Sequence, residues 1–159
     1  MARKKDATEP RPTIMVDITP KPTIYREATA MGRIHLKKDT VKRIRQGRIE
    51  KGDPLTTARI AAVLAAKQTS ELIPLCHPLP ITSVEVDEEV GEDFVMFKAR
   101  VKATARTGVE MEALTAVSLA LLTVWDMTKQ YEKNEEGQYP TTRIESIQVL
   151  EKVKKVNNQ

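Results

Sequence analysis

Residues 107–129 read TGVEMEALTAVSLALLTVWDMTK, and this run predicts one long helix around which the rest of the chain folds. Between Ala113 and Val124 the side chains are apolar or small on every face, which is typical of a helix covered by its own domain or by another subunit. Thr107 and Glu110 have the spacing of a capping box, so we expect Thr107 to cap this helix and Glu110 to pair back to it.

The same run is too polar to predict a membrane span, which needs roughly 18 consecutive apolar residues. Its charged residues lie at both ends. Glu112 and Asp126 are 14 residues apart, or about 21 Å along a helix, so they cannot both touch one small reacting centre. Either the substrate is extended, or the two ends serve different sites built from more than one chain. Asp126 and Lys129 are three residues apart and can meet each other or a shared ligand.

The composition favours one soluble domain. The chain has 159 residues, of which 40% are hydrophobic, enough for a single core. Its net charge of +4 permits anion binding, but with only 4% aromatic residues it has few stacking platforms for single-stranded nucleic acid, and we expect none to bind. The single cysteine, Cys76, excludes an internal disulfide and suits a reducing cytosol, so we expect a cytoplasmic protein with no membrane partner.

The periodicity around the long helix predicts a β-α-β-β-α-β order, an α+β sandwich with one helical layer over an antiparallel sheet. We expect strands at 27–36, 82–87, 94–104 and 143–152, helices from 39 or 40 to 47 and at 55–67, and a polar linker at 132–140. Residues 1–13 are expected to be a mobile tail, 14–152 a single domain, and 153–159 a frayed C-terminal tail.

The segment 51–54, KGDP, predicts a helix start. Asp53 is a natural N-cap, and Pro54 fits the first helical position. Lys51 precedes this helix, where backbone N–H groups and the helix dipole favour an anion. Since most lysines ahead of helices are simply exposed, this position alone is weak evidence for a site.

The segment 71–80, ELIPLCHPLP, is named here the Cys–His loop. Its three prolines exclude regular structure and predict a rigid loop that presents Cys76 beside His77. Two adjacent candidates without a second pair make a poor zinc site, so no metal is expected. A nucleophilic cysteine and an inert buried thiol both remain open, and His77 could act as a proton donor or a phosphate ligand.

These segments together resemble the cyclic pyranopterin monophosphate synthase family of molybdenum cofactor biosynthesis. The resemblance covers residues 15–152. It depends on six runs: MVDI at 15–18, KGD at 51–53, ARIA at 58–61, LIPLCHPL at 72–79, TGVEMEAL at 107–114 and DMTK at 126–129. The proline-flanked Cys–His loop and the TGVEMEAL run are long and unusual in composition, so chance agreement in both is very improbable.

The resemblance implies a ferredoxin-like fold in a homohexamer, a trimer of dimers, whose active sites lie at the dimer interface. The implied enzyme is a lyase that converts a cyclised dihydro-GTP derivative to cyclic pyranopterin monophosphate and releases pyrophosphate, without metal or other cofactor. The residues 14–152 would then be a catalytic domain. The implied catalytic residues are Asp126, Lys129 and Lys51. The implied substrate-binding residues are Leu75, Cys76, His77, Met111, Glu112, Arg26, Lys21 and Lys152.

The C-terminal end departs from the family pattern. The family commonly follows the lysine matched by Lys152 with a glycine-rich loop carrying another lysine, which is absent here; Lys154 and Lys155 are the candidates to replace it. A non-catalytic anion- or nucleotide-binding oligomeric module would use the same lysines, and a purely structural oligomer would need none of them. Neither alternative gives a reason for the rigid Cys–His loop or for an Asp126 that we expect to be buried.

Overall fold

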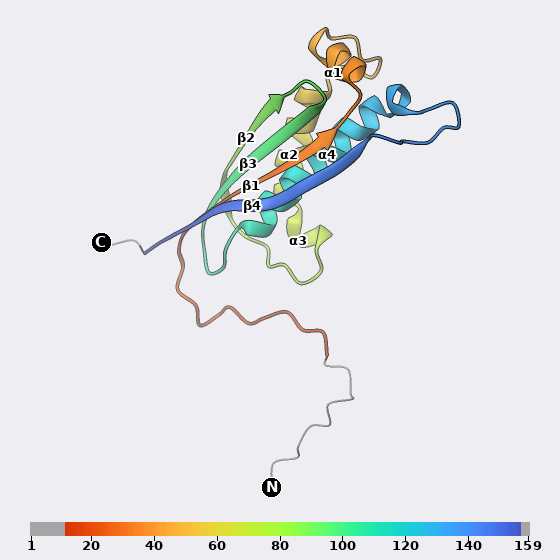
Figure 1. Cartoon of the computed structure of the whole chain (residues 1–159). Coiled ribbons are helices and arrows are strands. Elements are labelled where there is room, and N and C mark those ends of the chain that lie inside the picture. Colours follow the sequence, from red (N-terminus) through yellow and green to blue (C-terminus); the bar gives the residue numbers. More distant parts are fainter. Residues whose placement is uncertain (1–11, 157–159) are drawn as a thin grey trace.

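The computed structural model describes residues 12–156 and contains one antiparallel sheet with the strand order β2-β3-β1-β4. Figure 1 shows α2 and α4 lying together on one side of this sheet. The elements are β1 (Ile24–His35), α1 (Lys38–Arg45), α2 (Pro54–Lys67), α3 (Thr69–Leu72), β2 (Ile81–Val90), β3 (Phe94–Ala105), α4 (Glu110–Glu132) and β4 (Arg143–Lys155). The predicted α+β, ferredoxin-like fold is confirmed.

The inner face of the sheet carries small side chains where α4 crosses it. In β1, Ala28 and Ala30 are fully buried. Gly32 lies so close to α4 that an added Cβ would come within 2.8 Å of side-chain carbons of Leu121 and Val117. A larger residue at this position would therefore push the helix off the central strand.

Alanines also bring α2 against α4. The buried face of α2 consists largely of alanines: Ala58, Ala62, Ala65 and Ala66. The buried residues of α4 also include alanines: Ala113, Ala116 and Ala120. Because these side chains are small, the two helices approach closely. The predicted start of α2 is confirmed: the Asp53 carboxylate accepts hydrogen bonds from the N–H groups of Leu55 and Thr56, and Pro54 begins the helix.

The predicted capping box of α4 is wrong. The helix begins at Glu110 with Val109 at the N-cap, and no side chain caps it. Thr107 lies in the turn before it, and the Glu110 carboxylate instead pairs with Lys152, 42 residues further along the chain. A tertiary ion pair has replaced the local hydrogen bond to a backbone N–H that the T-x-x-E spacing predicts for this carboxylate.

The C-terminal end of α4 extends beyond the expected Lys129 to Glu132, a residue expected in a polar linker. Glu132 is fully buried. Its carboxylate accepts hydrogen bonds from the Lys37 N–H at 3.1 and 3.2 Å and from the Thr142 hydroxyl. It therefore ties the end of α4 to the start of α1 and to the segment leading into β4. Although α4 is long and apolar enough to cross a membrane, much of it is buried in the domain.

Other boundaries differ from the prediction: β1 begins at Ile24 and β2 continues to Val90, three residues beyond the expected ends in each case. The last strand continues to Lys155, which pairs with Tyr25, so the expected fraying is wrong for residues 153–155. Glu71 and Leu72 end the short helix α3, whereas the rest of the Cys–His loop is irregular as predicted. Residues 12–23 form an exposed arm leading into β1, and the expected mobility of 1–11 concerns residues outside the described range.

Candidate active site

Three predicted catalytic residues meet on α4 and the turn before α2, and we name them the Lys–Asp–Lys cluster: Lys51, Asp126 and Lys129. The Lys51 ammonium lies 2.8 Å from Asp126 Oδ2 and donates to the Asp126 carbonyl at 3.0 Å. The Lys129 ammonium lies 2.8 Å from Asp126 Oδ1. One carboxylate thus lies between two ammonium groups, one contributed by α4 itself and one by a distant segment.

The electrostatics of this cluster favour its fully charged form. Hydrogen bonds from Lys129 and Lys51 lower the pKa of Asp126 to about 2, and Asp126 raises the pKa of Lys129. The expectation that Asp126 is buried is wrong for the single chain, because 56% of its side chain is exposed.

An apolar hollow adjoins the cluster. It has a volume of about 380 Å³ and is lined by Leu122, Trp125 and Ile144 together with Asp126 and Lys129. The Leu122 side chain is 52% exposed. A large exposed leucine beside charged groups marks a surface suited to contact with another molecule.

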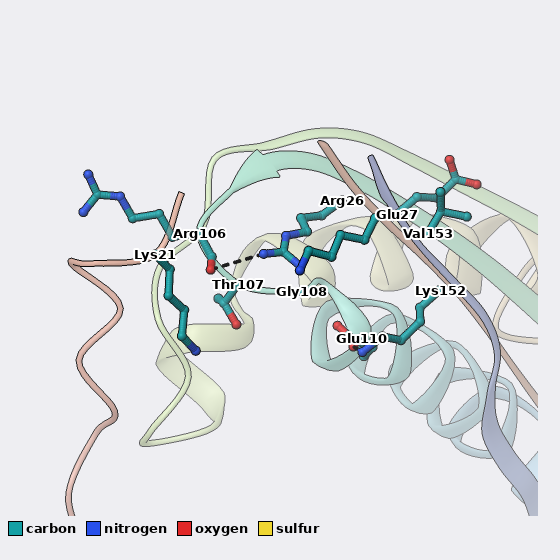
Figure 2. Close-up of a pocket in the computed structure, with 10 residues that line it drawn as sticks. Lys21, Arg26, Glu27, Arg106, Thr107, Gly108, Glu110, Lys152 and Val153 are labelled. Atoms are coloured by element: carbon teal, nitrogen blue, oxygen red, sulfur yellow. Dashed lines mark hydrogen bonds and ion pairs between the residues drawn. The ribbon is translucent and has the colours of Figure 1, made fainter. Parts of the chain in front are cut away.

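A second group surrounds a cavity of about 340 Å³ at the opposite end of α4, which we name the basic pocket (Figure 2). It is lined by Lys21, Arg26, Glu27, Arg106, Thr107, Gly108, Glu110, Lys152, Val153 and Lys154. Figure 2 shows the side chains of Lys21, Arg26 and Lys152 gathered around the space, whereas the Glu27 carboxylate and the Arg106 guanidinium point away from it. Positive charge therefore dominates this pocket.

Contacts inside the pocket come from segments far apart in the sequence. The Arg26 guanidinium donates to the Arg106 carbonyl at 3.5 Å, and Arg106 in turn donates to the Thr19 carbonyl at 3.0 Å, which fixes the arm. Lys152 pairs with Glu110 at 2.6 Å. Burial works to raise the pKa of the Glu110 carboxyl, but the hydrogen bond from Lys152 and one from its own N–H outweigh burial and hold that pKa below its usual range.

The third group lies near the first turn of α4. Glu112 is only 3% exposed, and its Oε2 has no hydrogen-bond partner among the described residues. Burial raises the pKa of this carboxyl, and the charge of Glu110 adds to the effect. In the Cys–His loop, burial and then Glu112 raise the pKa of the Cys76 thiol, which therefore remains protonated at neutral pH.

The structure thus sorts the predicted site residues into groups but does not join them all. Lys21, Arg26 and Lys152 share the basic pocket, and Glu112 lies close enough to Cys76 to influence its pKa. Leu75 and Met111 are exposed, at 45% and 40%. Hydrogen bonds with Thr19 are the main cause of the lowered pKa of Asp17, and His77 adds to that lowering. The Lys–Asp–Lys cluster stays apart, since Glu112 and Asp126 are separated by about 21 Å along α4.

Sequence reasoning did not place Glu110 in the basic pocket, because its spacing from Thr107 predicted a helix cap. It named Lys154 as a candidate phosphate ligand but expected it in a frayed tail, whereas Lys154 lies on β4 and lines the pocket. The alternation of β4 contained the signal for Lys154, because residues two apart on a strand share a face and Lys154 follows Lys152 by two. Within residues 12–156, no three His, Cys, Asp or Glu side chains lie close enough together to hold a metal ion.

Fold and site together define a ferredoxin-like α+β protein with a cationic pocket for an anionic ligand and a separate cluster of two lysines around an aspartate. The chain belongs to the MoaC family, which it matches over residues 15–155. It is 57% identical over 145 residues to a protein of Pyrococcus horikoshii, with 91% of each chain covered. It is 56% identical over 146 residues to one of Methanococcoides burtonii, covering 91% of this chain and 92% of the relative.

A third relative, from Sulfolobus acidocaldarius, is 54% identical over 140 residues, covering 88% of this chain and 98% of the relative. All three relatives are named probable cyclic pyranopterin monophosphate synthase. The similarity to these relatives covers most of this chain, and the match to the family model, over residues 15–155, includes each segment that contributes to the three groups of site residues.

Proposed function

We propose that this chain is a cyclic pyranopterin monophosphate synthase of molybdenum cofactor biosynthesis. It rearranges a cyclised dihydro-GTP derivative, and an oxygen of the substrate attacks the α-phosphorus to form the cyclic phosphate and expel pyrophosphate. This makes it a phosphorus–oxygen lyase. The observation that carries the proposal is the Lys–Asp–Lys cluster, because it brings together residues from two distant family-matching segments, 51–53 and 126–129.

The basic pocket suits the phosphate chain of this substrate. Expelling pyrophosphate builds negative charge on the leaving oxygens, and prepositioned cations stabilise that charge. Lys21, Arg26 and Lys152 surround the cavity, and Lys154 also lines it. In this role Lys154 replaces the lysine of the glycine-rich loop that the family commonly carries.

Glu112 suits the guanine-derived ring. A buried carboxyl with an unpaired oxygen gains by meeting donor groups such as a ring N–H or amino group. Leu75 of the Cys–His loop and Met111, the residue before Glu112, are both exposed and supply apolar contact with the ring. His77 and Cys76 form the rest of the proposed ring-binding surface. The Cys76 thiol packs against the substrate and does not attack it, since its pKa is raised.

The Lys–Asp–Lys cluster supplies the proton transfers of ring opening and ring closure. At neutral pH the Asp126 carboxylate is ionised, so Lys51 and Lys129 begin as proton donors held in place by it. A lysine that is to accept a proton needs a lower pKa, which burial under another chain provides. The exposed position of the cluster in one chain therefore favours a site completed by a neighbour.

The proposed assembly is a homohexamer built as a trimer of dimers. Exposed apolar side chains lie on two separate surfaces: Leu122, Ile147 and Leu150 on α4 and β4, and Ile60 and Leu64 on α2. Two distinct surfaces suit two distinct interfaces. A dimer that sets the Cys–His loop of one chain beside the Lys–Asp–Lys cluster of its neighbour resolves the separation of about 21 Å along α4. The protein is proposed to act in the cytoplasm, where Cys76 stays reduced.

Incubation of the purified protein with the cyclised nucleotide tests the proposal. Wild-type protein should release pyrophosphate and one pterin product in equal amounts, and light scattering should give the mass of six chains. The matched control is Lys38→Ala, which removes an exposed lysine paired with Glu92, outside the three groups of site residues. Binding of the nucleotide without release of pyrophosphate would favour the alternative, a non-catalytic nucleotide-binding module that uses the basic pocket alone.

A further inference from the structure

Lys51 lies on a tight turn between α1 and α2. The turn is closed by a hydrogen bond from the Gly52 N–H to the Ile49 carbonyl at 3.0 Å. Ile49 is buried in the core, and Gly52 has a φ of +104°, a conformation that favours glycine. The turn is therefore held from both sides of Lys51, and its geometry decides where the lysine side chain begins.

Between the two ends of the turn, Glu50 is attached to α4. The Glu50 N–H donates to the Tyr131 hydroxyl at 3.0 Å. The Gln130 side-chain amide donates to Glu50 Oε2, also at 3.0 Å. The Tyr131 ring is itself held by Arg43, whose guanidinium lies 5.1 Å from the ring centre. Gln130 and Tyr131 of α4 thus both bind Glu50, the residue directly before Lys51.

We propose that Tyr131 is a positioning residue for Lys51, which it serves by fixing the backbone of the turn through Glu50. The proposed role of Lys51 in proton transfer rests on the function proposed above, whereas the anchoring itself does not. Lysine is long and flexible, and an exposed ion pair such as Lys51 with Asp126 holds it only weakly. Anchoring the preceding backbone keeps the ammonium within reach of both Asp126 and a bound substrate.

The anchor would contribute to catalysis by orienting the Lys51 ammonium. Catalytic groups lose much of their effect when they are displaced by as little as 1 Å, even if their chemistry is unchanged. Without the Tyr131 hydroxyl, the Glu50 N–H turns to water and the turn moves away from α4. The distance between Lys51 and Asp126 then varies more, while the basic pocket at the other end of α4 is untouched.

The test uses Tyr131→Phe, which keeps the ring beside Arg43 and removes only the hydroxyl, and Gln130→Ala as a second variant. The first readout is the acylation rate of the Lys51 amine in a short pulse of acetic anhydride, measured by mass spectrometry relative to Lys38. The second is the separation of kcat from KM with the cyclised nucleotide. The matched control is Thr82→Val on the edge strand β2, which also removes one hydroxyl bonded to a backbone group, here the Lys102 carbonyl of β3.

We expect Lys51 in Tyr131→Phe to be acylated roughly threefold faster and kcat to fall about tenfold with KM nearly unchanged, while Thr82→Val changes neither. An unchanged acylation rate of Lys51 overturns the proposal, as does a faster rate with unchanged kcat. If the wild-type protein forms no product, the proposed function fails, but faster acylation in Tyr131→Phe still supports the anchor.

Discussion

The two ends of helix α4 present opposite designs. At its first turn, one chain alone builds a walled pocket in which cations outnumber the carboxylates facing the space. At the other end, sixteen residues further along the chain, the Lys–Asp–Lys cluster is exposed beside an open apolar hollow. The first site is enclosed by its own arm and strand, whereas the second has no cover in the chain itself.

The two ends of α4 differ because phosphate binding and proton transfer, the roles proposed for them, need different surroundings. A pocket for phosphate needs positive charge and a concave wall, which a single chain provides by placing lysines on a strand beside a helix start. Proton transfer near neutral pH needs groups whose pKa values are shifted by burial, and the chain leaves these exposed. Under the proposed function, we therefore expect a complete site to combine the covered end of one α4 with the open end of another.

The largest effect is expected at the open end. Asp126→Asn and Lys51→Ala should each reduce product formation by roughly 10²–10⁴-fold, because each removes a group that holds or moves a proton. The measurement is pyrophosphate release with the cyclised nucleotide, normalised to the amount of assembled protein found by light scattering. Lys38→Ala is the control and should remain fully active. Near-normal turnover in either variant would remove the assignment of proton transfer to this cluster.

The next effect concerns the covered end. Lys152→Ala should weaken pyrophosphate binding about tenfold, which is the loss of about 1.4 kcal/mol from one charge-assisted contact. Glu110→Gln should strengthen binding, since it frees Lys152 from a resident carboxylate. Calorimetric titration with pyrophosphate at two salt concentrations measures both, with Arg59→Ala, paired with Glu88 on the far side, as the control. Equal affinities for all three variants would contradict the assignment of phosphate to this pocket.

The contrast also shows how far sequence reasoning reaches. Repetitive local patterns predicted the strands, the helices and their order, because the 2- and 3.6-residue periods are local. The meeting of Asp126 with Lys129 followed from their spacing of three. By contrast, the contacts of Glu132 with Lys37 and of Glu110 with Lys152 join residues far apart in the chain, and they depend on how α4 packs against the rest of the domain.

The exposure of Asp126 was mispredicted for a related reason. The apolar run of α4 indicates burial, but it does not say whether the same chain or a neighbour supplies the cover. Leu122, four residues earlier, is likewise exposed in the single chain. The family resemblance named Lys51 as catalytic, but its contact with Asp126 depends on the turn that Tyr131 anchors, which no motif encodes.

A smaller effect is expected from Glu112, whose pKa is raised, whereas the pKa of Asp126 on the same helix is lowered. Burial raises the folded-state pKa of Glu112, so its ionisation reduces stability as pH rises through that pKa. Glu112→Gln should therefore raise the melting temperature at pH 7 by ~2–4 °C while losing substrate binding. Calorimetric scans at pH 4 and pH 7 measure it, and the gain should shrink at pH 4. A variant less stable than the wild type at pH 7 would mean that the Glu112 carboxylate has a favourable partner.

The smallest expected effect is the loss of folding stability at low pH that accompanies protonation of Asp126. Its folded-state pKa of about 2 lies below the ordinary value of 3.8, so its ion pairs stabilise the fold above that ordinary value and are lost as pH falls toward 2. Because the carboxylate is exposed, the loss is small and screened by salt. Urea unfolding at pH 6 and pH 3 should show a slightly larger drop in the free energy of unfolding for the wild type than for Asp126→Asn. Carbon NMR of the Asp126 carboxyl gives the pKa directly. A value near 3.8 in the proposed hexamer would mean that assembly separates Asp126 from its lysines, so that a neighbouring chain rearranges the open end instead of covering it.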